Sequence, residues 1–262
     1  MTSSPTPSPS EHVRVTTAAG IARIVMDRPA KKNALDGAMY RGLADGLTVA
    51  AADPAVRAIL LTGTPDVFCA GNDLADFAKV RAGAGGLSAM DFLHALVACP
   101  KPIVAAVAGW AVGIGTTMLL HCDFVYAAPS ARFRTPFVDL GLCPEAASSV
   151  LLPATVGPRI AAEMLLLGAE VDAVRARDAG LVTAIADDPV ARAEATCAEL
   201  ARRAPGAVRA TRALVRRPGQ AAIADALAAE QAAFLDRLRS DEAAEAAMAL
   251  MARRPPDFSR FS

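Results

Sequence analysis

Glu145 is the acidic residue whose sequence surroundings best suit acid–base chemistry. It lies in the apolar stretch GLCPEAASSV, residues 141–150, and the nearest basic residues are Arg134, eleven positions before it, and Arg159, fourteen after it. A carboxyl group buried without a cation has a raised pKa, which suits a general base near neutral pH. The alternative is structural, because a glutamate just after Pro144 at a helix start is favoured by the helix dipole. The pattern alone favours this structural interpretation.

Two glycine-bearing segments could bind an anion through their backbone. They are FCAGNDL, residues 68–74, and AGWAVGIGT, residues 108–116. Each places N–H groups where a strand turns into a helix, and such groups have no intrahelical acceptor and attract negative charge. Two of them converging on one oxygen would form an oxyanion hole. The alternative is that the glycines only permit tight turns, and the pattern leaves both interpretations open.

Other catalytic signatures are missing from the chain. It has no GxSxG elbow, no Walker A loop and no GxGxxG in a strand-to-helix turn. Its five cysteines form no CxxC pair and its three histidines are too scattered for paired metal ligands. We therefore expect no metal ion. Asp73 and Asp139 fit capping or turn positions better than catalysis, and Asp123 fits a structural position.

Composition favours a globular chain with a large core. Of the 262 residues, 53% are hydrophobic and 21% charged, which excludes general disorder. The formal net charge is 0, so there is no global attraction to nucleic acid, and we expect no nucleic-acid partner. The start, MTSSPTPSPSEH, has no apolar stretch and predicts a disordered tail over residues 1–11 rather than a signal peptide. The C-terminal FSRFS matches no peroxisomal or prenylation signal, and we expect a cytoplasmic location.

One uncharged segment raises the question of a membrane span. Residues 103–120 carry no charge over 18 positions, close to the length of a transmembrane helix. Gly109, Gly113 and Gly115 interrupt the segment and Pro102 precedes it. A buried strand, a tight loop and a helix start explain it better, so we expect no membrane partner.

The remaining pattern alternates strands with helices and then becomes helical. It predicts a β-hairpin over residues 12–27, a helix over 38–51 capped by Asp36 and a strand over 57–62. Helices over 73–81 and 88–98, with a flexible break at 82–86, a strand over 103–108, a helix over 113–121 and a strand over 122–127 are expected next. A strand-and-turn region over 133–142 follows, and the chain beyond Pro144 is expected to be helical except for a strand-like 181–185. This order is typical of an α/β fold with mainly parallel strands. We divide the chain into a core over residues 12–200 and a helical region over 201–262.

Six arginines begin that last region. They are Arg202, Arg203, Arg209, Arg212, Arg216 and Arg217. A solvated helix face is the favoured interpretation and a phosphate site the alternative.

These segments together resemble one known superfamily. The two glycine-bearing segments, Cys122-Asp123, Arg28-Pro29 with Asn33-Ala34-Leu35, and the AGLV of residues 179–182 resemble the crotonase (enoyl-CoA hydratase/isomerase) superfamily, in the same order from about His12 to Met251. The resemblance implies an α/β spiral of repeated ββα units with a C-terminal helical region used in trimer formation. It also implies an acyl-CoA thioester as substrate, with coenzyme A part of that substrate and no further cofactor, and a homotrimer or dimer of trimers.

The resemblance carries over a set of site residues. The oxyanion hole would be the backbone N–H groups of Asn72 and Ile114. The substrate-binding residues would be Lys31, Ala70, Gly71, Asp73, Leu74, Gly113, Phe137 and Leu142, with Ala70 and its neighbours on the adenine side. Lys31, Lys32 or the arginine cluster could meet the phosphates of coenzyme A.

The departures from the family pattern point to one subgroup. The family's hydratases use two glutamates, and at the matching positions this chain has Thr117 and Phe137, which cannot move a proton from carbon. The block around Phe137 and Glu145 is similar to the peroxisomal-type Δ3,Δ2-enoyl-CoA isomerases, in which the glutamate here numbered 145 is the catalytic base. We therefore expect an isomerase that moves a double bond from C3 to C2. The alternatives are a hydratase or another crotonase-type lyase or hydrolase, a non-catalytic acyl-CoA-binding protein, and a membrane protein.

Overall fold

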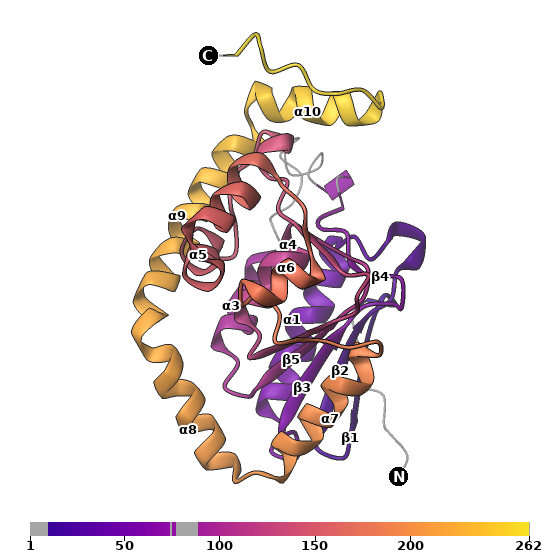
Figure 1. Ribbon diagram of the computed structural model, residues 1–262, viewed down its shortest axis with the longest axis vertical. Helices are drawn as coiled ribbons and strands as arrows, with labels where there is room; N and C mark the ends of the chain where they lie inside the picture. Colours follow the sequence, from indigo (N-terminus) through magenta and orange to yellow (C-terminus); the bar gives the residue numbers. More distant parts are fainter. Residues whose placement is uncertain (1–9, 74, 77–88, 262) are drawn as a thin grey trace.

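The computed structural model describes residues 10–73, 75–76 and 89–261 as an α/β core extended by an arm of helices (Figure 1). Of the predicted tail, residues 1–9 lie outside this range, whereas Ser10 is buried and its hydroxyl accepts the N–H of His12. Leu74, most of the predicted helix 73–81 and the predicted break at 82–86 also lie outside the described residues.

The larger sheet has six strands in the order β1-β2-β3-β5-β7-β10. Their bounds are β1 Val13–Ala18, β2 Ile21–Met26, β3 Ala58–Thr62, β5 Ile103–Val107, β7 Phe124–Ala127 and β10 Ala184–Ile185. The hairpin β1–β2 is antiparallel and every other pair is parallel. The predicted hairpin and the parallel pairing are thus confirmed.

A second, four-stranded sheet has the order β4-β6-β8-β9. Its strands are β4 Val67–Cys69, β6 Trp110–Val112, β8 Arg132–Arg134 and β9 Val171–Asp172. The chain alternates between the sheets: β3, β5 and β7 lie in the large sheet, and each is followed by β4, β6 or β8 in the small one and then by helical structure. This is the repeated ββα spiral that the resemblance implies.

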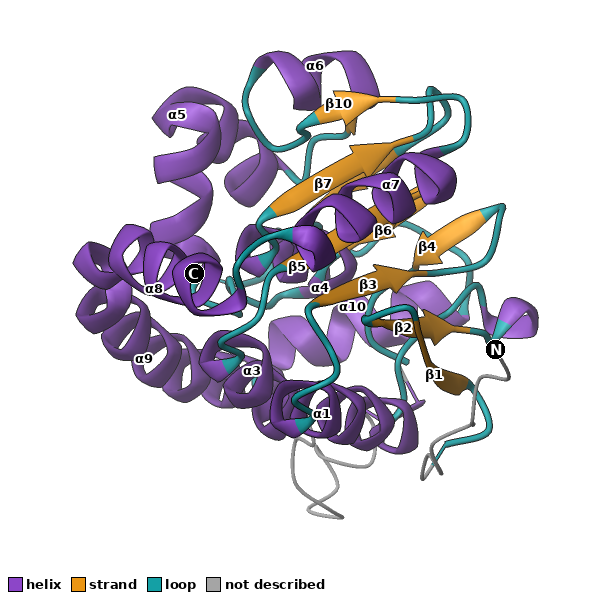
Figure 2. Ribbon diagram, turned by 90° about the horizontal axis from the view of Figure 1, so that it is seen from below, coloured by secondary structure: helices purple, strands orange, loops and turns teal. Residues whose placement is uncertain are grey.

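Helices cover both faces of the large sheet (Figure 2). The core helices are α1 Gly37–Ala52, α3 Ala89–Ala98, α4 Ile114–Thr117, α5 Ser148–Leu167, α6 Ala173–Asp178 and α7 Pro189–Arg202. Strand β3 shows the two-sided burial: Ile59 packs in the main core cluster, while Leu60 packs in the cluster that contains Ala193 and Cys197 of α7. A parallel sheet covered on both faces requires such continuously apolar strands.

Three further helices form the arm. They are α8 Pro205–Arg216, α9 Gln220–Leu238 and α10 Asp241–Met251, and Figure 1 shows α8 and α9 curving around the core until α9 lies beside α5. Short 3-10 turns occupy Pro29–Lys31, Met118–His121, Val138–Leu140 and Arg217–Gly219. The C-terminal region therefore returns to the core.

Two short strands were not predicted. Trp110–Val112 forms β6 inside the segment expected to be a loop, and Val171–Asp172 forms β9 inside the region expected to be helical. Strands of three and two residues are too short for side-chain alternation to appear in the sequence. The predicted strand and helix start over residues 103–120 are confirmed as β5 and α4.

Within the described residues, one helix is long and apolar enough to cross a membrane by length and composition, namely α5. It contains Pro153 and Pro158 and a non-helical Gly157. A single such helix also occurs in the cores of globular proteins, so it is weak evidence for a span.

Gly115 sets how closely α4 approaches β4. A Cβ atom on Gly115 would lie 2.6 Å from the carbonyl oxygen of Cys69, which is a backbone atom that cannot rotate away. We expect Gly115→Ala to lower the free energy of unfolding by about 1–3 kcal/mol, measured by urea denaturation, because overpacking forces the backbone apart.

The matched control is Gly206→Ala in the exposed helix α8, where an added Cβ would meet no atom within 4 Å. It should leave stability unchanged or raise it by up to about 1 kcal/mol, since alanine favours helix. Equal effects of the two substitutions would contradict the packing argument.

Candidate active site

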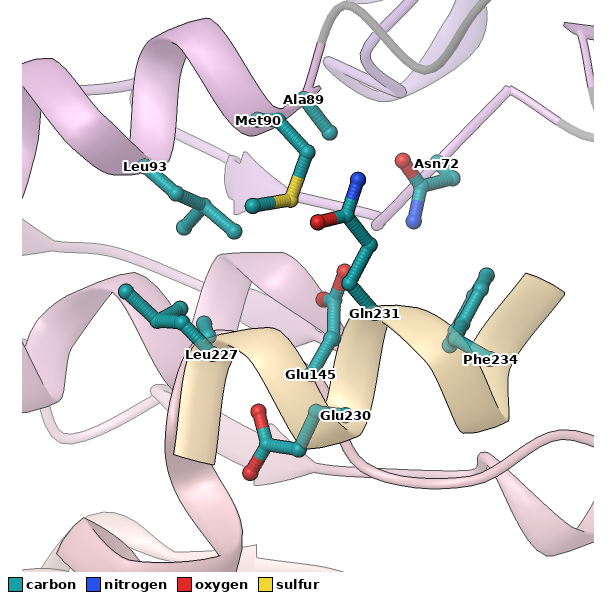
Figure 3. Close-up of a pocket in the computed structure, with 10 residues that line it drawn as sticks. Asn72, Ala89, Met90, Leu93, Glu145, Leu227, Glu230, Gln231 and Phe234 are labelled. Carbon is teal, nitrogen blue, oxygen red and sulfur yellow. The ribbon is translucent and has the colours of Figure 1, made fainter. Parts of the chain in front are cut away.

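Glu145 lies in the loop before α5, with its side chain directed into a cavity (Figure 3). The residue is only 9% exposed. Helix α5 begins at Ser148 and its N-cap is Ala147, so Glu145 precedes the helix instead of occupying its first turn. The structural interpretation of Glu145 as a residue placed for the helix dipole is therefore wrong.

Burial gives Glu145 the electrostatics of a base that works near neutral pH. Its pKa is raised to about 8, first by desolvation and then by the negative charge of Glu230, while a hydrogen bond from Thr117 acts in the opposite direction. That hydrogen bond is long, 3.5 Å from the Thr117 hydroxyl oxygen to Oε1, and weakly opposes the shift. Within the described part of the chain, no cation acts on Glu145 strongly enough to offset its burial.

The segment around Asn72 carries the first of the two predicted amides. Asn72 follows β4 and forms a parallel bridge with Leu35, in which the N–H of Leu35 bonds to Gly71 O and the N–H of Asp73 bonds to Leu35 O. In an extended strand successive N–H groups alternate sides, so the Asn72 N–H points away from Leu35. The Asn72 side chain is fixed separately, because the Tyr40 hydroxyl donates to its Oδ1.

The second amide, of Ile114, begins α4. Gly113 is the helix N-cap, and an N–H at this first helical position has no acceptor inside the helix. Gly113 adopts a positive φ of 55°, which a residue with a side chain rarely adopts.

The two glycines bring these amides together. β4 and β6 are parallel neighbours, so their carboxyl ends lie at the same edge of the small sheet. A Cβ built on Gly113 would lie 4.0 Å from the Cα of Gly71, and one on Gly71 would lie 3.1 Å from the carbonyl oxygen of Val112. The amides of Asn72 and Ile114 each follow one of these closely approaching glycines. They lie at the carboxyl ends of the strands, where α/β sheets bind ligands.

Two small cavities meet at Asn72 and Phe234, which line both. The first has a volume of about 30 Å³ and is lined by Asn72, Ala89, Met90, Leu93, Glu145, Ala146, Leu227, Glu230, Gln231 and Phe234. The second has a volume of about 120 Å³ and is lined by Ala70, Gly71, Asn72, Val112, Gly113, Pro136, Phe137, Leu140, Leu142 and Phe234. The acid and the two glycine-bearing segments thus face adjoining space.

Five of the predicted substrate-binding residues line this space. Ala70, Gly71, Gly113, Phe137 and Leu142 line the second cavity. Lys31 is exposed at the end of the 3-10 turn Pro29–Lys31, near enough to Asp73 to act on its charge. Leu74 lies outside the described residues.

Asp73 has structural partners. Its Oδ2 accepts a hydrogen bond from the Arg28 guanidinium at 2.8 Å and its Oδ1 accepts the N–H of Ala75 at 3.1 Å. Burial alone would raise its pKa, but these bonds, with the charges of Arg28 and Lys31, hold it below its usual value. The capping and turn interpretation made for this residue is confirmed.

The arginine cluster is only partly a solvated face. Arg212 forms an ion pair with Asp123 at 2.8 Å, and Arg216 donates to the carbonyl oxygen of His121 at 2.6 Å. Both arginines are half-buried and attach α8 to the core, while Arg202, Arg203, Arg209 and Arg217 are exposed. The structural position expected for Asp123 is confirmed.

Sequence reasoning missed the contribution of α9 to the site. Leu227, Glu230, Gln231 and Phe234 all come from this helix, far along the chain from Glu145. A signal was present: Glu230 occupies the same buried face as Leu227, Phe234 and Leu238, at helical spacing. A glutamate within such an apolar stripe requires a polar partner.

The structure thus combines a ββα spiral with two amides at adjoining strand ends and one buried acid, Glu145. The family model for enoyl-CoA hydratase/isomerase matches residues 16–260, and the chain belongs to this family. A crystal structure of an enoyl-CoA hydratase/isomerase from Pseudoalteromonas atlantica superimposes with a TM-score of 0.90 at 41% identity, covering 95% of this chain and 100% of that one.

The similar curated proteins include both isomerases and hydratases. The chain is 34% identical to enoyl-CoA delta isomerase 2 of Rattus norvegicus over 254 residues, which is 94% of this chain but only 65% of that protein's length. It is 33% identical to 2,3-dehydroadipyl-CoA hydratase of Escherichia coli over 90% of this chain and 93% of that protein. These relatives support crotonase-type enzyme chemistry and do not separate isomerase from hydratase.

The raised pKa of Glu145 has a consequence for stability that needs no substrate. Between the ordinary glutamate pKa and its folded value of about 8, the folded chain retains a proton that the unfolded chain has lost. Folding stability must therefore decrease as pH rises through this window. We expect wild type to lose a few kcal/mol at most relative to Glu145→Gln between about pH 5 and pH 8, at about 1.4 kcal/mol per unit.

Urea denaturation of both proteins at several pH values measures this difference, because groups shared by the two proteins cancel. Parallel stability curves would contradict the burial of an ionisable Glu145.

Proposed function

We propose that the protein is a Δ3,Δ2-enoyl-CoA isomerase. The observation that carries the proposal is that one of the two carboxyl groups at the cavity is available for proton transfer. Among the residues that the structure describes, two carboxyl groups line the first cavity, those of Glu145 and Glu230. Both oxygens of Glu230 accept backbone N–H groups, from Ala147 and Ser149, which leaves Glu145 as the acid able to exchange protons with a ligand.

The proposed reaction moves one proton along the substrate. The thioester oxygen of a 3-enoyl-CoA accepts hydrogen bonds from the N–H groups of Asn72 and Ile114. Glu145 removes a proton from C2, and the electron pair of the C–H bond spreads through the C3–C4 double bond and the carbonyl as a dienolate. The protonated Glu145 then returns the proton to C4, so the double bond lies between C2 and C3 and the carboxylate is regenerated. One base suffices because C2 and C4 lie on one face of the planar intermediate.

The surroundings of the acid support isomerisation over hydration. Hydration requires one group to activate water and a second to deliver a proton. Thr117 and Phe137 stand at the positions where the family's hydratases have glutamates, and in the structure Thr117 contacts Glu145 while Phe137 lines the second cavity. The buried Phe137 and Leu142 would exclude water from the dienolate.

The resemblance extends the proposal to the rest of the molecule. Lys31, which is exposed and near enough to Asp73 to act on its charge, could meet a phosphate of coenzyme A, and coenzyme A enters as part of the substrate with no separate cofactor. Assembly as a homotrimer or a dimer of trimers and a cytoplasmic location belong to the same proposal.

Glu145→Gln tests the base directly. We expect the turnover of 3-hexenoyl-CoA to fall by about 10²–10⁴-fold, because the amide cannot accept the C2 proton. Affinity for hexanoyl-CoA, measured by calorimetry, should change by less than about threefold, since the amide keeps the shape of the side chain.

Crotonyl-CoA hydration is assayed in parallel with wild type. Hydration as fast as isomerisation would favour a hydratase, and binding without turnover of either thioester would favour a binding protein.

The pH dependence of wild-type turnover provides a second test. Glu145 must be ionised in the free enzyme, and its pKa is raised to about 8. We expect kcat/KM for 3-hexenoyl-CoA to rise about tenfold per pH unit below this value and to level off above it, because kcat/KM reports the free enzyme. An acid limb near the ordinary pKa of glutamate would show that another environment, or another group, supplies the base.

A further inference from the structure

Glu230 of α9 binds the turn that carries Glu145. Its Oε2 accepts the N–H of Ala147 at 2.6 Å and its Oε1 accepts the N–H of Ser149 at 2.8 Å. Glu230 is 7% exposed, so water competes little for these bonds. The carboxylate that serves the N-terminus of α5 is therefore supplied from a helix more than eighty residues later, and charge-assisted bonds of this kind are about twice as strong as neutral ones.

The turn held in this way adopts an unfavourable conformation. Ala146 and Ala147 have φ values of 60° and 57°, in the left-handed region that residues with a side chain rarely adopt, because their Cβ atom crowds the following carbonyl oxygen there. Such strain persists only where surrounding contacts impose it. Besides Glu230, His121 contributes a contact of 2.8 Å from Nε2 to the carbonyl oxygen of Ala146.

Apart from Glu230, four ionisable groups around Glu145 are neutral at the pH where Glu145 titrates. Burial lowers the pKa of His121 to about 4, so its ring is uncharged and its Nε2–H donates to Ala146. Burial raises the pKa of Tyr40 well above its usual value, that of Cys69 to about 12, and that of Cys143 above its usual value. Among the described residues, Glu230 is the charged group whose field raises the pKa of Glu145.

We propose that Glu230 is a positioning residue for Glu145: it holds the strained turn that aims the base into the cavity. The negative charge of Glu230 also acts on Glu145. The inference rests on the proposed function only in taking Glu145 as the base. It also gives the C-terminal region a part in the chemistry, because the proton-transferring loop is held by α9.

Three single variants separate geometry from charge. Glu230→Gln keeps the size of the side chain but removes the charge, and its NH₂ group would face one of the two N–H donors. Glu230→Asp keeps the charge but is too short to reach both donors. Asp225→Asn is the matched control, because it removes one negative charge from the same helix at an exposed position.

The first measurement needs no substrate. In protein labelled with ¹³C at the glutamate carboxyl carbons, the Glu145 signal is assigned by its loss in Glu145→Gln and then titrated. We expect its midpoint to fall by half a unit or more in Glu230→Gln, and to stay within about 0.3 units of wild type in Asp225→Asn. The midpoint in Glu230→Asp should lie closer to wild type than to Glu230→Gln.

The second measurement is turnover of 3-hexenoyl-CoA. Both Glu230 variants should lose at least about tenfold in kcat with KM changed less than threefold, because a misplaced base slows proton transfer more than it weakens binding. The acid limb of kcat/KM should move to lower pH in Glu230→Gln alone. A merely structural residue would lower the yield of folded protein without moving the titration or this limb.

Two results would overturn the inference: a Glu145 midpoint in folded Glu230→Gln equal to that of wild type, or kcat within twofold of wild type in both variants. If Glu230→Gln does not fold, the kcat of Glu230→Asp decides, since tenfold loss supports the inference and unchanged turnover rejects it. If wild type shows no isomerase turnover, the proposed function has failed, and the carboxyl titration still tests the action of Glu230 on Glu145 by itself.

Discussion

The site depends on keeping a carboxyl group inside the protein without a cation. Removing Glu145 from water disfavours its charged form. Among the described residues, the group that stabilises this charge is the Thr117 hydroxyl, at 3.5 Å from the carboxylate. The cost of burial raises the pKa of Glu145 to about 8, which suits the proton removal that we propose. The rest of the core must therefore compensate for the free-energy cost of burying Glu145. Apolar packing on both faces of the parallel sheet contributes this stability.

The ββα spiral solves the positioning problem by alternation between sheets. Because each turn of the spiral sends one strand to each sheet, β4 and β6 become parallel neighbours although more than forty residues separate them. The amides of Asn72 and Ile114 lie at their carboxyl ends, next to Gly71 and Gly113. A Cβ atom on Gly113 would lie 4.0 Å from the Cα of Gly71. Neither segment could form this pair of amides alone, since each contributes one amide and the two strands must be neighbours in the sheet.

The C-terminal helices complete the site from outside the spiral. α9 supplies one wall of the cavity through Leu227, Gln231 and Phe234, and it supplies Glu230 to the base-carrying turn (Figure 3). Arg212 and Arg216 attach α8 to Asp123 and His121 of the core. The proposed isomerase chemistry thus combines a fold shared by the family with a turn that the arm holds in a strained shape.

Sequence alone determined the local structure and the chemical candidates. Apolar alternation, the Asp36 cap and the glycine breaks predict most elements, because these depend on neighbours in the chain. The absence of basic residues near Glu145 in the sequence predicts only the direction of its pKa shift, since burial and Glu230 produce that shift. Only the tertiary structure decided that Glu145 lies outside α5, that Glu230 takes the place at that helix's N-terminus, and that Thr117 faces the base. Those contacts join residues 28 to 83 positions apart, and no spacing or periodicity in the sequence encodes which distant side chain reaches which backbone amide.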